Sequence, residues 1–154
     1  MTFFKMVNTI VLAMEIKIQK LSKNAILPKY AHPGDAGLDL FSQENFTLEP
    51  FERHEFSLGF ALELPAGAVS LIWDKSGLAA KHGIHLLGGV IDSGYRGEYK
   101  AIMVNLGSKP YKVEKGDKIG QLLIQPVMHV TIKQTKKLSN TSRGQGGFGS
   151  TGRK

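Results

Sequence analysis

The chain has 154 residues, of which 42% are hydrophobic, and this suits one compact domain with a real core. It contains no cysteine, which excludes a disulfide framework and thiolate metal sites and fits a reducing compartment. Twenty Lys and Arg against thirteen Asp and Glu give a formal net charge of +7, which favours anionic partners such as phosphorylated small molecules or nucleic acid.

Residues 1–13 are mildly apolar but broken by polar side chains. A membrane-spanning helix needs about 20 apolar residues, so this stretch is no such segment. Its short apolar run and weakly charged start also make a poor signal peptide. It is a misassigned start, an added strand or a disordered extension, and a cleaner strand opens at Met14.

The dominant period of the remaining chain is two. Apolar residues alternate along 14–18, 56–64 and 128–132, which predicts strands with one face on a core. Turn signals rich in Gly, Pro and Asp recur between such runs. This pattern predicts an all-β sandwich, jelly roll or barrel. One short helix is predicted over Ser76–His82, because helix formers follow the serine and Gly83 ends them.

From about Leu138 the composition changes to Ser, Asn, Thr and Gly, with Phe148 as the only large aromatic side chain. Such a stretch buries too little surface to order itself, so a flexible terminus is the simple interpretation. Closely spaced glycines, however, let backbone N–H groups approach an anion, and Arg143 offers a fork for phosphate oxygens. A mobile tail that orders over a phosphorylated ligand carrying a ring would use all of these features.

Two earlier stretches combine turns with chemistry-bearing side chains. Pro33–Leu40 contains Asp35 and Asp39, and taken alone this stretch favours a plain turn entering a strand, with Asp35 as turn former and Asp39 exposed on the strand. Asp74–Ala79 contains Lys75 and Ser76 at the start of the predicted helix, where an ammonium, a hydroxyl and N–H groups would form a phosphate cradle. An ordinary capped helix is the alternative.

Two later stretches have the same double character. Gly88–Glu98 reads as a β-hairpin leading into Asp92, and its glycines would expose backbone groups to the edge of a base. A plain hairpin with a turn aspartate is the alternative. Gly116–Leu122 places Gln121 between apolar neighbours, and a half-buried glutamine needs partners.

In this order and spacing, the five stretches resemble the trimeric dUTPase family, over about Glu15–Gly152. The resemblance implies a β jelly roll with one short helix that forms a homotrimer with exchanged C-terminal arms. It implies a cytoplasmic enzyme that hydrolyses dUTP to dUMP and pyrophosphate with Mg²⁺, without a membrane or an obligatory nucleic-acid partner. The expected organisation is an extension at 1–13, a β domain at 14–137 and a flexible glycine-rich arm at 138–154.

The resemblance also assigns roles to residues. The hairpin backbone at Gly89, Val90 and Ile91 would hold uracil, and Tyr95 would pack on the deoxyribose and exclude a 2′-hydroxyl. Asp92 would orient and deprotonate the attacking water.

The remaining roles concern the phosphate chain and closure of the site. The expected phosphate contacts are Lys75, Ser76, Gly77 and Gln121, and the expected arm contacts are Arg143, Phe148 over uracil, Gly149 and Ser150. Asp39 or Asp35 would touch waters on the magnesium ion, which the phosphates themselves hold.

Several positions depart from the family pattern. Lys75 stands where arginine is usual, so the charge is kept but the bidentate fork is lost. Asp74 replaces a usual proline and Trp73 a small residue, and the sequence explains neither. Leu86 replaces an asparagine of some members, so that backbone alone would read uracil.

Two rival functions remain. A dCTP deaminase of the same fold would need a glutamate base in the strand after the hairpin, but Tyr99–Asn105 carries no carboxylate. A non-catalytic dUTPase-like binding protein would keep the fold without turnover, and the presence of Asp92, Tyr95 and Phe148 favours the enzyme.

Overall fold

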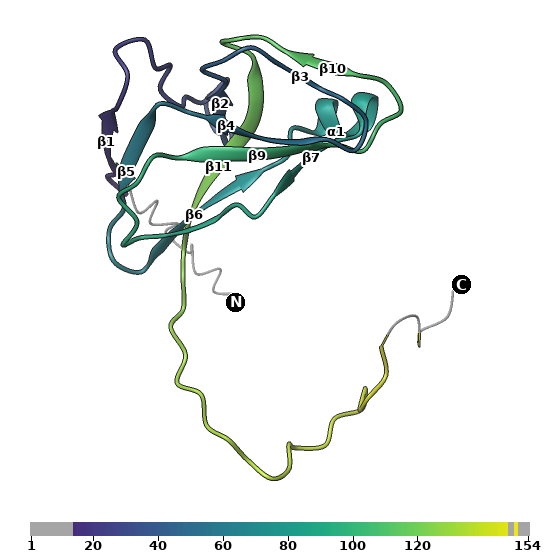
Figure 1. Ribbon diagram of the computed structural model, residues 1–154. Helices are drawn as coiled ribbons and strands as arrows, with labels where there is room; N and C mark the ends of the chain where they lie inside the picture. Colours follow the sequence, from purple (N-terminus) through teal and green to yellow (C-terminus); the bar gives the residue numbers. More distant parts are fainter. Residues whose placement is uncertain (1–13, 148–149, 151–154) are drawn as a thin grey trace, which may run out of the picture.

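The computed structural model describes residues 14–147 and 150, and these form a mostly-β body with one short helix and a long C-terminal segment (Figure 1). In chain order the elements are β1 (Lys17–Lys20), β2 (Leu38–Phe41), β3 (Phe46–Leu48), β4 (Arg53–Ser57), β5 (Phe60–Glu63), β6 (Ala68–Trp73), α1 (Ser76–His82), β7 (Ile84–Leu87), β8 (Val90–Asp92), β9 (Lys100–Asn105), β10 (Tyr111–Val113) and β11 (Lys118–Pro126).

Two antiparallel sheets form most of the body. The larger has the order β2-β11-β6-β8, and the smaller has the order β4-β9-β7. The pairs β1-β5 and β3-β10 add two short ladders. Strand β6 lies at the centre of the site described below, because it pairs with β11 from Trp73 to Ala68 and with β8 from Leu71 to Val69.

One cluster of buried apolar side chains joins these sheets. Its members alternate along the strands, as one-sided burial requires, and include Leu40, Leu48, Phe56, Leu58, Phe60, Leu62, Ile72, Leu86, Tyr99, Met103, Ile119 and Leu122. Tyr99 stacks on Phe60 with ring centroids 5.3 Å apart, and its hydroxyl lies 2.8 Å from Ser70 Oγ. Burial raises the pKa of Tyr99, so this buried polar pair stays uncharged at neutral pH.

The predicted helix is confirmed. It spans Ser76–His82 and ends at Gly83, whose φ of 69° places it in the left-handed region that glycine tolerates. The Gly83 N–H donates to the carbonyl of Ala79 at 3.0 Å. Among the described residues, no helix has the length and apolar character that a membrane crossing requires.

Two predicted strands have different limits. The first begins at Lys17 rather than Met14. The run 56–64 is divided into β4 and β5 by Gly59, which has a φ of 71°. A Cβ there would lie 2.9 Å from Ala25 Cβ, so the break needs glycine for its conformation and for the close approach.

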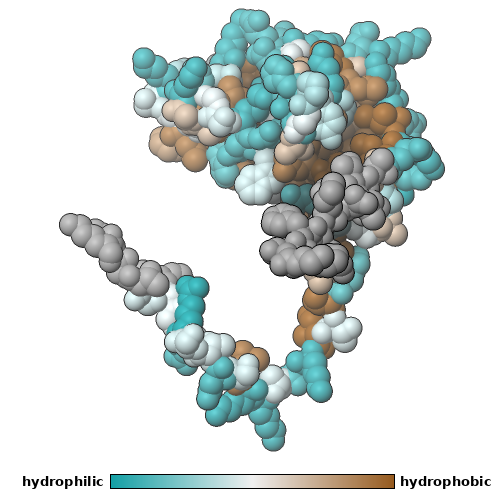
Figure 2. All heavy atoms as spheres, turned by 180° about the vertical axis from the view of Figure 1, so that it is seen from behind, coloured by the Kyte–Doolittle hydropathy of each residue, from teal (hydrophilic) through white to brown (hydrophobic). Residues whose placement is uncertain are grey.

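The prediction of a strand at 128–132 is wrong for the single chain. After β11 ends at Pro126, residues 127–147 contain neither helix nor strand. Met128, Val130 and Ile132 are 89%, 76% and 91% exposed. Their segment stands away from the body, and its first part carries hydrophobic side chains (Figures 1 and 2). Alternation alone forms no ladder where no neighbouring strand edge is available.

Candidate functional site

Three of the sequence motifs meet at one end of the larger sheet. Gln121 on β11 stands opposite both Asp39 on β2 and Trp73 on β6. Because β6 leads into Asp74 and Lys75 before α1 begins, this register brings the three motifs together. Gln121 Nε2 donates to the carbonyl oxygen of Asp74 at 2.7 Å, and Lys75 Nζ donates to Asp39 Oδ1 at 2.5 Å.

Two lysines share the carboxylate of Asp39. Lys118 Nζ lies 2.7 Å from Oδ2, while Lys75 holds Oδ1. Burial alone would raise the pKa of Asp39, but the hydrogen bonds and charges of Lys118 and Lys75 outweigh it and hold the pKa below its usual value. Lys118 could not be assigned to the site from sequence, because its position beside Asp39 depends on how β11 pairs with β2. The cluster therefore presents two ammonium groups around one ionised carboxylate.

Ser76 and Gly77 are exposed at the first turn of α1. The N-cap residue is Lys75, which has an extended backbone and no side-chain capping bond. The Ser76 hydroxyl therefore does not cap the helix, and it lies next in sequence to Lys75.

The turn before β2 supports this cluster sterically. A Cβ at Gly37 would lie 2.7 Å from Gln121 Oε1, so the absence of a side chain leaves room for the glutamine amide. Asp35 is exposed in the same turn, and its carboxylate accepts the N–H of His32 at 2.8 Å. Asp39, and not Asp35, thus lies within the lysine cluster.

The segment predicted as a hairpin is opened. Strand β7 pairs with β9 in the smaller sheet, whereas β8 pairs with β6 in the larger one. The two strands diverge at Gly88 and Gly89, whose φ angles are 69° and 91°. The Gly89 carbonyl accepts the N–H of Ile72 at 2.8 Å, and a Cβ at Gly89 would lie 2.5 Å from the Ile72 carbonyl oxygen. The hairpin predicted over Gly88–Glu98 is therefore wrong, because β8 pairs with β6 and no strand follows β8 before β9 begins at Lys100.

A cavity of about 300 Å³ opens beside the diverging strands. Its lining includes the five residues of the β domain that were predicted to bind the base and sugar or to activate water, namely Gly89, Val90, Ile91, Asp92 and Tyr95. A second cavity of about 320 Å³ shares Gly89 and extends to Trp73, Asp74 and His85.

The turn between β8 and β9 holds Tyr95 in place. The Tyr95 hydroxyl donates to the carbonyl of Glu98 at 3.0 Å, and its N–H donates to the carbonyl of Asp92 at 3.1 Å. A Cβ at Gly97 would collide with the Tyr95 hydroxyl. The ring is 45% exposed and is therefore available to a ligand in the cavity.

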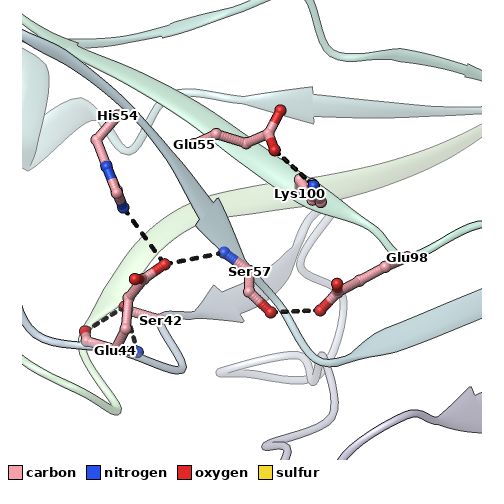
Figure 3. Close-up of polar contacts among 7 residues, drawn as sticks. All are labelled: Ser42, Glu44, His54, Glu55, Ser57, Glu98 and Lys100. Atoms are coloured by element: carbon pink, nitrogen blue, oxygen red, sulfur yellow. Dashed lines mark hydrogen bonds and ion pairs between the residues drawn. The ribbon is translucent and has the colours of Figure 1, made fainter.

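A chain of polar contacts ties this turn to β4 (Figure 3). The Glu98 carboxylate accepts the Ser57 hydroxyl and, at 2.9 Å, the N–H of Gly59. The Ser57 N–H donates to Glu44 Oε1 at 3.2 Å, and His54 Nε2 lies 3.4 Å from the same oxygen. Glu98 thus links the Tyr95 turn to a neighbouring strand, a role that sequence spacing did not indicate.

A carboxylate also reaches the cavity from outside the segment that the sequence singled out. Glu55 on β4 stands opposite Ile102 on β9, and both line the cavity. The stretch Tyr99–Asn105 lacks the carboxylate that a dCTP deaminase would require, but Glu55 reaches the same cavity from the neighbouring strand. Glu55 Oε1 is paired with Lys100 Nζ at 2.5 Å.

The glycine-rich motif that begins at Arg143 lies on the C-terminal arm, away from the body that carries the other motifs (Figure 1). Arg143 is exposed, and its Nε donates to the carbonyl of Gly146 at 2.9 Å within a local turn. Ser150 is exposed as well, while Phe148 and Gly149 lie outside the described residues.

The lysine cluster around Asp39 and the cavity beside Asp92 lie at opposite ends of β6. Asp92 stands opposite Val69, whereas Gln121 stands opposite Trp73. Four residues of strand separate these positions, which corresponds to about 13 Å at roughly 3.3 Å per residue. The predicted site residues are thus distributed over three places in one chain: the lysine cluster, the cavity beside Asp92 and the arm.

The donor set fits magnesium that is carried by phosphate rather than by the chain. No group of three His, Asp or Glu side chains among the described residues could hold a metal ion. Asp39 already contacts two lysines, so it is suited to water-mediated contact with an ion on a bound phosphate chain.

Known proteins resemble this chain over most of its length. A dUTPase family model matches residues 23–152. The deoxyuridine 5′-triphosphate nucleotidohydrolase of Clostridium kluyveri is 49% identical over 141 residues, which covers 90% of this chain and 99% of that protein. The enzyme of the same name from a Hydrogenobaculum species is 47% identical, covering 92% of this chain and all of that protein.

Solved structures give the same result. A variant of the Staphylococcus bacteriophage 80alpha dUTPase with dUpNHpp has a TM-score of 0.84 and 31% identity, covering 90% of this chain and 98% of that one. A variant of the dUTPase from phage phi11 of S. aureus, described with a structural Mg(II) ion, has a TM-score of 0.76 and 28% identity, covering 82% and 99%. The chain therefore belongs to the dUTPase family.

Proposed function

We propose that the protein hydrolyses dUTP to dUMP and pyrophosphate by attack of an Asp92-activated water on the α-phosphorus. Family membership supports the substrate. The observation that carries the residue-level account is the cavity beside β8, where Asp92, Tyr95 and the opened backbone at Gly89 share one space. In the cell this reaction limits uracil in DNA and supplies dUMP for thymidylate synthesis.

Uracil enters between the diverging strands and is read by backbone groups of Gly89, Val90 and Ile91. Strands β7 and β8 separate at Gly88 and Gly89 and pair with different sheets, which leaves room for a base edge to approach the backbone there. The Gly89 carbonyl already accepts the Ile72 N–H, and Ile91 is paired with Ser70 on β6. A narrow opening of this kind excludes thymine by its methyl group. It rejects cytosine because the donor and acceptor at its edge are exchanged.

Tyr95 forms the platform under the deoxyribose. Its hydroxyl is fixed on Glu98, so the ring cannot swing away to admit a 2′-hydroxyl. Asp92 lies at the head of the same turn, with an exposed carboxylate that can take a proton from water.

The lysine cluster receives the phosphate chain. Lys75, Ser76, Gly77 and Gln121 are neighbours at the start of α1. On binding, Lys75 shares its ammonium between Asp39 and phosphate oxygens, while Lys118 keeps Asp39 neutralised. Asp39 would contact waters on a magnesium ion held by the phosphates of dUTP, and that ion would supply neutralisation of the phosphate charge.

Assembly as a cytoplasmic homotrimer with exchanged arms brings the three places together. The support is the exposed apolar part of the arm at Val130 and Ile132, whose hydrophobic surface calls for a partner, and the separation of the two clusters along β6. The arm of a neighbouring copy then brings Arg143 and Ser150 to the phosphates and Phe148 over uracil.

The proposal is tested by pyrophosphate release from dUTP with magnesium, for the wild type and for Asp92→Asn. The wild type is expected to turn over, whereas the variant should lose about 100-fold or more in kcat, as expected for a general base. Calorimetry with a non-hydrolysable imido analogue of dUTP should show equal affinity for both proteins. Tight binding of the analogue without turnover of dUTP by the wild type would favour a non-catalytic binding protein.

A further inference from the structure

Asp74 stands directly before Lys75 of the lysine cluster, at a position where the dUTPase family usually has proline. Proline restrains a chain by its ring, whereas aspartate can do so only through bonds. The contacts of Asp74 therefore decide whether the substitution has a role.

The Asp74 carboxylate makes two contacts with β7. Its Oδ1 accepts the N–H of Leu86 at 2.6 Å, and its Oδ2 lies 2.7 Å from Nδ1 of His85. Its own carbonyl oxygen accepts Gln121 Nε2 at 2.7 Å. One residue thus connects β7, β11 and the segment that carries Lys75.

These contacts anchor the segment to β7 and not the reverse. Strand β7 is held by its ladder with β9, from Ile84 opposite Asn105 to Leu87 opposite Ile102, and the Leu86 side chain is buried. Asp74 and Lys75 lie in neither a strand nor a helix. The restraint therefore passes from the fixed strand to the connecting residues.

Like-charge repulsion would oppose such a carboxylate beside a phosphate site. The side chain of Asp74 is 28% exposed, and both oxygens face hydrogen-bond donors or His85 on the side of β7. The Asp74 carboxylate is thus bonded to β7, while the Lys75 ammonium is bonded to Asp39.

We infer that Asp74 is a positioning residue for the phosphate subsite: it fixes Lys75 and, through its carbonyl, Gln121 in the places where a polyphosphate binds. The inference rests on the proposed function for its substrate. It adds that a hydrogen-bonded aspartate does in this chain what a restrained backbone does in proteins with proline there.

The test compares Asp74→Ala and Asp74→Asn with the wild type. Asparagine keeps an oxygen that can accept the Leu86 N–H, so it is the conservative variant. Glu63→Ala, which removes an exposed carboxylate paired with Lys17, is the matched control. The measurements are kcat and KM for dUTP, calorimetric affinity for pyrophosphate, and calorimetric affinity for dUMP, which also carries the base and sugar.

Asp74→Ala is expected to raise KM and the pyrophosphate dissociation constant by about tenfold, the effect of losing hydrogen bonds to a charged group. The kcat should change much less, because Asp92 lies at the other end of β6. Affinity for dUMP should fall less than affinity for pyrophosphate. Asp74→Asn should recover most of the loss, and Glu63→Ala should match the wild type.

A lower melting temperature of Asp74→Ala with unchanged pyrophosphate affinity would overturn the inference and leave Asp74 a purely structural residue. Should Asp74→Ala fail to fold, His85→Ala carries the test, because it removes one of the two contacts on β7. Its pyrophosphate affinity is then expected to fall by a smaller factor, and no change would overturn the inference. Absence of dUTP turnover in the wild type would instead defeat the proposed function, since pyrophosphate binding is measured without turnover.

Discussion

Lys75 Nζ lies 2.5 Å from Asp39 Oδ1, and Lys118 occupies the other oxygen of the same carboxylate at 2.7 Å. Asp39 therefore orients the lysine that the sequence assigned to phosphate binding. The cluster keeps a net positive charge, since two ammonium groups face one carboxylate.

Replacement of Lys75 tests its role in turnover. Lys75→Ala should lower kcat/KM for dUTP by about 100-fold, as expected when a charged donor to the reacting phosphates is lost. Lys75→Arg should match or exceed the wild type, because guanidinium keeps the charge and adds a bidentate fork. Lys112→Ala, which removes an exposed lysine paired with Glu114, is the control in steady-state assays. An unchanged rate for Lys75→Ala would remove this lysine from the site.

The lowered pKa of Asp39 predicts a pH-dependent contribution to stability. The ionised carboxylate is favoured in the folded protein, so its contribution is complete above the ordinary pKa of about 3.9 and is lost as the pH falls through the lower folded pKa. Urea unfolding at a fixed protein concentration should show Asp39→Asn as less stable at neutral pH. The difference should narrow as the pH is lowered below about 4, and a difference that widens there would contradict the assignment.

Discrimination against the 2′-hydroxyl depends on the space beside Tyr95. Gly97→Ala places a methyl group against the Tyr95 hydroxyl, so the ring must leave its bond to Glu98. The ratio of kcat/KM for dUTP over that for UTP should then fall by about tenfold or more. Gly94→Ala is the matched control, because a Cβ there meets no atom within 4 Å. Equal discrimination in the two variants would separate Tyr95 from sugar selection.

The arm should act across subunits. A chain that ends before Arg143 should fold and assemble but lose most of its turnover, because closure over the phosphates is lost. When this truncated chain is mixed with full-length Asp92→Asn, mixed trimers should regain part of the activity. If subunit exchange is demonstrated and no activity returns, each arm serves its own subunit.

The sequence predicted those features that depend on neighbouring residues. The helix at Ser76–His82 was predicted because its end needs only Gly83, and the alternating runs identified a β fold. Features set by register were not predictable. Lys118 reaches Asp39 only because β11 pairs with β2, and Glu55 reaches the cavity only because β4 pairs with β9.

Two predictions failed because backbone partners lie far away in sequence. Gly88–Glu98 was predicted to be a hairpin, but β6 takes the bonds that a hairpin would have formed within itself. The alternation at Met128, Val130 and Ile132 indicated a strand, yet within residues 14–147 these positions form no strand and are exposed. In both cases the local pattern predicted extended backbone and left its partner undetermined.

Selective hydrolysis of dUTP is tested by pyrophosphate release from dUTP, dTTP, dCTP and UTP, measured side by side with magnesium. Release from dUTP should be rapid, and the rates for the other three should be at least about 100-fold lower, since a site that bonds a base edge strongly rejects analogues with altered groups there. Ammonia production from dCTP is followed in the same samples and should be absent. Comparable rates for dTTP or UTP would contradict both the opened-strand base pocket and the role of Tyr95.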